Sequence, residues 1–91
     1  MRGVSIEFDP AKDEANVAKH GISLARASEF EILAMEPDHR VRYGEERWRS
    51  WGRIGGVDYC LAFTVRSGRV RAISLWRASR KGMARHVPQA D

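Results

Sequence analysis

The sequence has little of what disulfide-bonded, membrane-spanning or secreted proteins require. Cys60 is the only cysteine, so no disulfide forms within the chain and a zinc site built from several thiolates is excluded. No apolar run comes near the roughly 20 residues that cross a bilayer. The first residues also lack the charged, apolar and small-residue segments of a secretory signal. We therefore expect a cytoplasmic protein that does not bind membranes.

Signatures of several enzyme classes are missing as well. No two of the three histidines stand at a spacing that binds a metal ion, and the carboxylates are scattered, mostly over the N-terminal part. Phosphate-binding glycine loops, dinucleotide fingerprints and nucleophilic triads are absent from the sequence. We therefore expect neither a metal site nor a cofactor.

Charge is divided unevenly along the chain, which we expect to form one domain spanning residues 1–91. Residues 1–38 contain four basic and eight acidic side chains, whereas residues 39–91 contain twelve basic and four acidic ones. Thirteen of the sixteen basic residues are arginines, whose planar guanidinium binds phosphate oxygens in pairs. This composition favours RNA or DNA as a partner. A solvated basic face that only aids solubility is the alternative that composition leaves open.

Helix signals follow a short strand that we expect at residues 5–8. Asp9 and Pro10 supply an N-cap and a first helical position, and Gly21 is suited to end the helix. A stripe of apolar residues at helical spacing is expected to be buried on this helix: Ala11, Ala15, Ala18 and Ile22. Ser23 is predicted to cap a second helix that continues to residue 34 and stops before Pro37.

From residue 39 onward the pattern changes to strands and tight turns. Antiparallel strands are predicted at residues 41–43, 46–54, 57–66 and 69–76. The pairs at residues 55–56 and 67–68 are typical of hairpin turns, because glycine accepts the positive φ that strand twist demands. A short last helix is expected at residues 79–85. The order predicts an α+β domain in which helices cover one face of a three- to four-stranded meander, and in which one sheet face and the last helix frame a basic groove.

Two cations of the first helix are candidates for chemistry. His20 ends the helix, where the helix dipole favours positive charge, and this alone accounts for its position. An imidazole also transfers protons near neutral pH, which is the functional alternative. Lys12 lies in the first turn, where the same dipole disfavours a cation. Neutralisation by Asp9 and Asp13 explains Lys12, and a phosphate ligand is the functional alternative.

Arginines and tryptophans alternate with other residues along the expected strands. A period of two places the arginines of each strand on one face: Arg47, Arg49 and Arg53 on one strand, and Arg69, Arg71 and Arg77 on another. Basic side chains interleaved with aromatic rings grip a nucleic-acid backbone and stack on bases. Trp51 or Trp76 is therefore a candidate platform for a base, and a position in the core or in a partner interface is the alternative.

Three stretches of the sequence resemble one known family. The most specific is FDPAKDEANVAKHGIS, with Asp9, Lys12, Asn16, Lys19, His20 and Gly21. It is similar to the N-terminal signature of the BrnT-like ribonuclease toxins of bacterial type II toxin-antitoxin systems. The stretches GEERWRSWGRI and LAFTVRSGRVRAISLWRAS resemble the strands of that family. The resemblance covers nearly the whole chain and implies a RelE-like α+β fold.

The resemblance also implies an activity and partners. Members of the family resemble metal-independent endoribonucleases that cleave messenger RNA and inhibit translation. A small antitoxin with a ribbon-helix-helix DNA-binding part is expected to neutralise the toxin, and operator DNA is expected to be bound only through that antitoxin. A non-catalytic module of the same fold, which binds RNA or an antitoxin without cutting, is the alternative.

Cleavage without a metal uses the 2′-hydroxyl of the RNA as the nucleophile, so it needs proton transfer and cations that stabilise the phosphorane. We expect Lys12, Arg66 and Arg77 to stabilise the phosphorane and His20 to transfer the proton, with Glu45 as a weaker candidate. The other expected RNA contacts are Lys19, Arg47, Trp51, Arg53, Arg71 and Arg80.

The last helix departs from the family pattern. The family commonly carries a glutamate and then a tyrosine after the arginine of the last strand, whereas this chain has RASRKGMARH, with Gly82 and His86 at about those positions. We expect His86 to serve as a replacement acid or base. A cation that merely ends the helix is the alternative.

Overall fold

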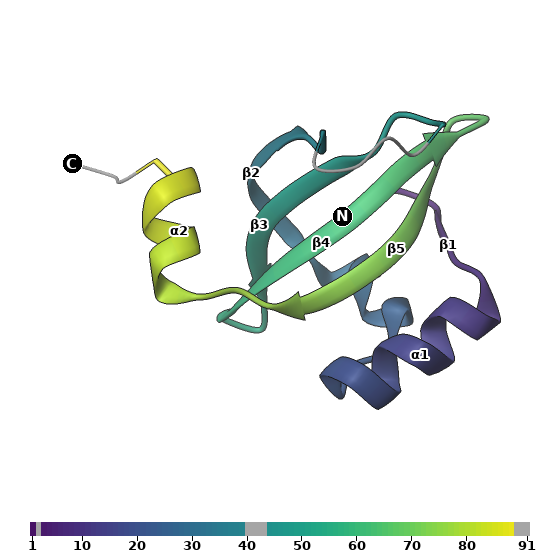
Figure 1. Cartoon of the computed structure of the whole chain (residues 1–91), viewed down its shortest axis with the longest axis horizontal. Coiled ribbons are helices and arrows are strands. Elements are labelled where there is room, and N and C mark those ends of the chain that lie inside the picture. Colours follow the sequence, from purple (N-terminus) through teal and green to yellow (C-terminus); the bar gives the residue numbers. More distant parts are fainter. Residues whose placement is uncertain (2, 40–43, 89–91) are drawn as a thin grey trace.

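The computed structural model describes residues 1, 3–39 and 44–88, and Figure 1 shows their arrangement. Within these residues a five-stranded sheet has the order β1-β5-β4-β3-β2, with β1 parallel to β5 and the other neighbours antiparallel. The elements in chain order are β1 (Ile6–Glu7), α1 (Pro10–His20), the 3-10 helix η1 (Leu24–Glu29), β2 (Glu31–Pro37), β3 (Trp48–Ile54), β4 (Val57–Arg66), β5 (Arg69–Arg77) and α2 (Arg80–His86). This arrangement confirms the predicted α+β class.

α1 begins and ends where the sequence predicts. The Asp9 carboxylate accepts a hydrogen bond from the backbone N–H of Ala11 (2.8 Å), and Gly21 adopts the left-handed conformation with φ 72°. The expected buried stripe is confirmed only at Ile22, which lies just beyond α1 and is buried. The three alanines of the stripe are exposed, and within α1 the buried residue is the polar Asn16.

The expected second helix is correct only at its start. Ser23 caps it as predicted by accepting a hydrogen bond from the backbone N–H of Ala25 (3.1 Å), but the helix is a 3-10 helix that ends at Glu29. The chain then extends into β2, which pairs with β3. Apolar residues over so short a run fit a helix or a strand equally well, and pairing with a neighbouring strand decides between them.

Three of the predicted antiparallel strands are confirmed as β3, β4 and β5. The hairpin turns at residues 55–56 and 67–68 connect them. β2 pairs with the outer side of β3 and adds a fourth antiparallel strand. The strand expected at residues 41–43 lies outside the described residues.

The helices do not share one face of the sheet, contrary to expectation. Leu24 and Phe30, in and directly after η1, pack against Leu61 on one face, which we call the η1 face. α2 covers the opposite face, the α2 face, where Met83 packs against Trp51. Figure 1 accordingly shows α1 beside β5 and α2 at the far end of the molecule. No helix in the described part of the chain is long and apolar enough to span a membrane.

An irregularity in β5 determines which way its side chains point. Ala62 of β4 pairs with Ser74, whereas the next residue, Phe63, pairs with Ala72. Ile73 therefore has no partner in β4, which is the definition of a β-bulge. Such a bulge shifts the alternation of the strand by one residue.

The bulge separates the arginines of β5. Arg71 pairs with Thr64, so it lies on the α2 face, together with Arg69. Arg77 pairs with Tyr59 and lies on the η1 face, with its guanidinium carbon 5.8 Å from the centre of the tyrosine ring. The expectation that the three arginines of this strand share one face is therefore wrong.

Gly52 in β3 permits a close approach between this strand, β2 and the core. A Cβ atom at this residue would overlap the backbone carbonyl oxygen of Glu31 and lie 2.8 Å from the ring of Phe30. Phe30 is fully buried, so its ring has no open space into which to move. The position therefore requires glycine for steric reasons.

We expect Gly52→Ala to lower the free energy of unfolding by about 3 kcal/mol, at the upper end of the usual cost of over-packing a core, because the obstacle is backbone. Chemical denaturation followed by tryptophan fluorescence measures the change. Gly82→Ala is the matched control, since the added Cβ meets the Ser79 hydroxyl at 3.1 Å and a side chain can move. Its change should stay below about 1 kcal/mol. Equal losses in the two variants would contradict the steric explanation.

Candidate functional site

α1 is attached to the sheet through the side-chain amide of Asn16. Its Nδ2 donates to the backbone oxygens of Leu75 and Ile22 (both 2.9 Å), and its Oδ1 accepts from the backbone N–H of Leu75 (3.0 Å) and the hydroxyl of Ser74 (3.3 Å). Among the described residues, β1 borders β5 only as far as Arg71. The amide therefore takes the place of a neighbouring strand and satisfies both backbone groups of Leu75.

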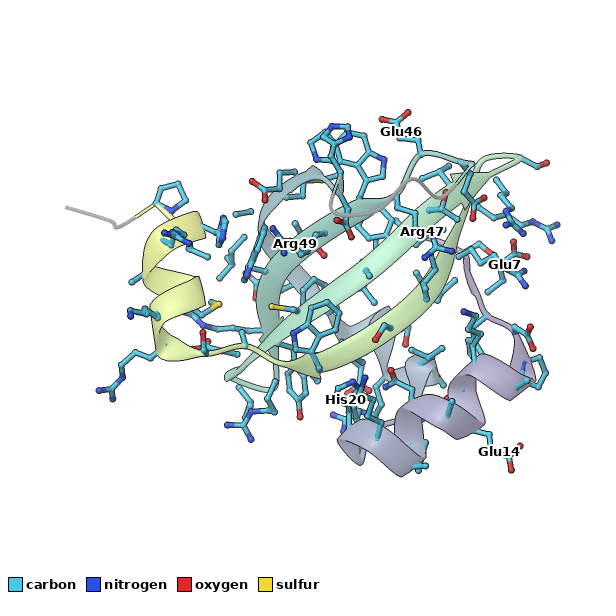
Figure 2. All side chains as sticks on the ribbon, in the orientation of Figure 1. Glu7, Glu14, His20, Glu46, Arg47 and Arg49 are labelled. Atoms are coloured by element: carbon cyan, nitrogen blue, oxygen red, sulfur yellow. The ribbon has the colours of Figure 1, made fainter. Side chains whose placement is uncertain are left out.

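Lys12 and His20 each lie one helical turn from Asn16, in opposite directions along α1. Residues four apart share a helix face, so the bonds of Asn16 also turn these two side chains toward β5. Lys12 lines one hollow beside β5, and His20 lines a second. Figure 2 shows His20 at the end of α1, on the side that faces the sheet.

The first hollow, which we call the cationic hollow, has a volume of about 190 Å³. It is lined by Asp9, Lys12, Glu45, Arg47, Arg66, Arg71, Ala72 and Ile73. The three arginines come from the segment before β3, the end of β4 and the first half of β5. Residues from four parts of the chain thus converge on a space that suits a phosphate group.

The second hollow, which we call the indole hollow, has a volume of about 300 Å³. It is lined by Lys19, His20, Asp38, Arg47, Ala62, Ile73, Ser74 and Trp76. Because Arg47 and Ile73 line both hollows, the two are adjacent, and we refer to them together as the trough. Its floor is the bulged part of β5, and α1 forms one wall.

Glu45 holds the guanidinium group of Arg66 in the cationic hollow. Nε of Arg66 donates to one carboxylate oxygen of Glu45 (3.0 Å), and Nη2 donates to the other oxygen (3.0 Å). Nε of Arg47 lies 3.8 Å from the same carboxylate. A bidentate pair fixes the plane of the guanidinium as well as its position. Glu45 therefore aims Arg66 rather than leaving it as a mobile surface charge.

Positive charge predominates in the trough. The lysines and arginines that line it are Lys12, Lys19, Arg47, Arg66 and Arg71, and the carboxylates are Asp9, Asp38 and Glu45. A concave surface with an excess of cations concentrates a polyanion. Within the described part of the chain, no three His, Cys, Asp or Glu side chains form a group that could hold a metal ion.

The structure brings some of the residues predicted for the site together and leaves others apart. Six of the predicted site residues line the trough: Lys12, Lys19, His20, Arg47, Arg66 and Arg71. Arg77 does not, because the bulge turns it to the η1 face. Arg53 pairs with Asp58 (3.0 Å) near the β3–β4 turn, and Arg80 is exposed at the start of α2. Neither of these two lines the trough.

His86 and Trp51 contact each other beneath α2 instead of facing the trough. Their rings are stacked with centroids 3.6 Å apart and an angle of 12° between their planes, and Nδ1 of His86 lies 3.9 Å from the Glu36 carboxylate. Trp51 is only 4% exposed. The predicted base platform at Trp51 is therefore corrected to a core role. Of the two tryptophans considered for that role, Trp76 is the one that lines the trough.

Of two further carboxylates in the trough, the sequence pattern does not indicate Asp38 and indicates Glu45 only weakly. Asp38 is buried, and its backbone N–H donates to the Arg47 carbonyl (2.8 Å), but no spacing rule links it to His20. Glu45 did carry a signal. The register of the β3–β4 hairpin, continued outward beyond its last pair, sets Glu45 opposite Arg66.

Comparison with known proteins identifies the family. A sequence model described as "Ribonuclease toxin, BrnT, of type II toxin-antitoxin system" matches residues 8–82, a range that contains every residue of the trough. The chain belongs to the BrnT family of ribonuclease toxins. The resemblance seen in the sequence is thereby confirmed. A search of curated proteins finds no significant match.

A solved BrnT structure has a similar fold. The crystal structure of the Brucella abortus ribonuclease toxin BrnT matches with a TM-score of 0.64 and 22% identity, covering 85% of this chain and 99% of that chain. This likeness supports the α+β fold described above. The RelE-like relationship stays a prediction.

We expect Asn16→Leu to lower the free energy of unfolding by about 2–4 kcal/mol, because it leaves the buried N–H and C=O of Leu75 without partners. Denaturant titration measures the loss, and hydrogen exchange of the Leu75 amide should accelerate. Val17→Ala, at an exposed position of the same helix, is the control and should change stability by less than about 0.5 kcal/mol. An Asn16→Leu protein as stable as wild type would show that α1 is held by other contacts.

Proposed function

We propose that the protein is the toxin of a type II toxin-antitoxin system and acts as a metal-independent endoribonuclease that cleaves messenger RNA in the cytoplasm. The observation that carries this proposal is the trough, in which a histidine, two lysines and three arginines meet beside β5. Membership of the BrnT ribonuclease toxin family supports it. Cleavage of messenger RNA would inhibit translation.

The reaction proposed for the trough is transesterification by the RNA itself. His20 accepts the proton of the 2′-hydroxyl, whose oxygen attacks the adjacent phosphorus to form a 2′,3′-cyclic phosphate. The 5′ oxygen leaves and takes a proton from water. Lys12 and Arg66 stabilise the negative charge that develops on the phosphorane, as cations do best when they are held in place beforehand.

The other trough residues bind and orient the RNA. Arg47 and Arg71 contact the phosphates next to the one that is cleaved, since guanidinium groups bind phosphate oxygens in pairs. Glu45 holds the guanidinium of Arg66 in the cationic hollow through hydrogen bonds from Nε and Nη2, and Nη1 is the nitrogen of Arg66 proposed to contact the phosphate. His86 and Arg77, both predicted as catalytic from the sequence, have no part in this scheme because they do not line the trough.

His20→Ala and Lys12→Ala are each expected to reduce the rate of RNA cleavage by about 100-fold or more, the usual effect of removing an acid-base or charge-stabilising group. Incubation of the pure variants with labelled RNA measures the rates, and toxicity on expression should fall in parallel. Lys81→Ala is the control, because this lysine is exposed on α2 and does not line the trough. It should cleave at the wild-type rate. Full activity of both trough variants would disprove the assignment.

An excess of chelator separates the enzyme from a binding module. The wild-type protein should cut RNA in the presence of EDTA and leave 2′,3′-cyclic phosphate ends, which mass spectrometry detects. Binding of RNA without cutting would favour the non-catalytic module instead. Loss of cutting on chelation would contradict the metal-independent mechanism.

The antitoxin is proposed to be a small protein with a ribbon-helix-helix DNA-binding part, and operator DNA is contacted only through it. We expect the product of a neighbouring gene to co-purify with this chain and to suppress cleavage at equimolar concentration. Gel-shift measurements should detect operator binding by the complex but not by the toxin alone. Specific operator binding by the isolated chain would contradict this division of tasks.

A further inference from the structure

We infer that the indole hollow is a nucleobase subsite that binds guanine on the 5′ side of the scissile phosphate. This inference rests on the proposed ribonuclease function and adds a base preference to it. The hollow has a volume of about 300 Å³. This lies at the lower end of the roughly 300–1,000 Å³ of small-molecule sites, so it suits a single base rather than a longer segment.

Trp76 provides the surface on which the base stacks. Its side chain is half-buried, lines the hollow and lies 6.3 Å from the His20 ring, at an angle of 35°. An indole that is partly open to a cationic trough is the usual platform for an unpaired base. Trp51, by contrast, is buried and its ring is stacked on His86. The hollow next to His20 is therefore the place in the trough where an aromatic platform and the proposed catalytic group meet.

The polar groups of the hollow match the edges of guanine. Asp38 is 94% buried, and both oxygens of a carboxylate accept hydrogen bonds. Guanine has two adjacent donors on its Watson–Crick edge, N1–H and the N2 amino group, which a carboxylate can accept together. A carboxylate has about four acceptor positions, so Asp38 can serve a base in addition to its contacts within the protein.

Cations complete the match on the other edge. Lys19 and Arg47 line the same hollow. Lysine and arginine bind O6 and N7 of guanine more often than any other base atoms. Adenine and cytosine each offer one amino donor. Neither base therefore satisfies the carboxylate and the cations as well as guanine does.

The position of His20 determines on which side of the bound guanine the RNA is cut. His20 lines the hollow, and Arg47 and Ile73 connect the hollow to the cationic one that holds the phosphate. A base in the indole hollow thus belongs to the nucleotide whose 2′-hydroxyl lies next to His20. This nucleotide supplies the nucleophile, so cleavage follows the guanine and leaves a guanosine 2′,3′-cyclic phosphate end.

The test uses oligodeoxynucleotides that contain a single ribonucleotide, with G, A, C or U at that position. Only one bond can then be cut, and we expect the G substrate to be cleaved at least about tenfold faster than the other three. Asp38→Asn should reverse the preference toward A, because an amide matches the edge of adenine. Trp76→Ala should slow cleavage of all four substrates, while Trp76→Phe should retain most of the rate. Equal rates for the four bases in the wild-type protein would overturn the inference.

A second measurement does not depend on catalysis, and its readout comes from the wild-type protein. Indole ¹⁵N–¹H NMR signals of the wild-type protein are recorded with GMP, AMP, CMP and UMP, and Trp76→Phe identifies the Trp76 signal. GMP should shift that signal at lower concentration than the other nucleotides. A selective shift without RNA cleavage would retain the subsite and reject the proposed function. Cleavage without a selective shift would retain the function and reject the subsite.

Discussion

The geometry of the site depends on one side-chain amide at the edge of the sheet. β5 is bordered by the two-residue β1 for only part of its length, so the backbone groups beyond it need another partner. Asn16 supplies that partner from a helix, through hydrogen bonds to both backbone groups of Leu75. The same bonds set the rotation and height of α1 against the strand. Lys12 and His20 are therefore directed into the trough by a residue that touches no RNA in the proposed reaction.

The bulge at Ile73 is the second constraint, since it divides β5 into two halves of opposite alternation. Before the bulge, Arg71 faces the trough. After it, Leu75 enters the core while Trp76 faces the indole hollow. With uninterrupted alternation these last two side chains would exchange faces, placing an indole in the core and a leucine in a cationic hollow. The added residue of the bulge thus allows the same strand to contribute an apolar side chain to the core and an indole and a guanidinium to the trough.

Features determined by neighbouring residues could be predicted from the sequence, and features determined by pairing could not. The limits of α1 follow from Asp9 and Gly21, which cap it locally, and the turns predicted the two hairpins. β2 was mistaken for helix because its apolar spacing fits both elements, and only the presence of β3 decides. Arg77 was placed on the same face as Arg69 and Arg71 because a bulge leaves no mark on the alternation of the sequence. Asp38 was missed because its proximity to the trough arises from the folding of distant segments.

The way in which α1 is held has a consequence for temperature. Asn16 is the buried residue of this helix, and the alanines of the expected stripe are exposed. Packing of α1 against the sheet consequently removes little apolar surface from water. The stabilisation of this helix on the sheet comes mainly from hydrogen bonds. The stabilisation that comes from burying apolar surface weakens on cooling, because this burial carries a large heat-capacity change. Stabilisation by hydrogen bonds of this kind does not weaken in the same way. The alignment of helix and strand should accordingly persist in the cold, even as the apolar core under η1 loses part of its driving force.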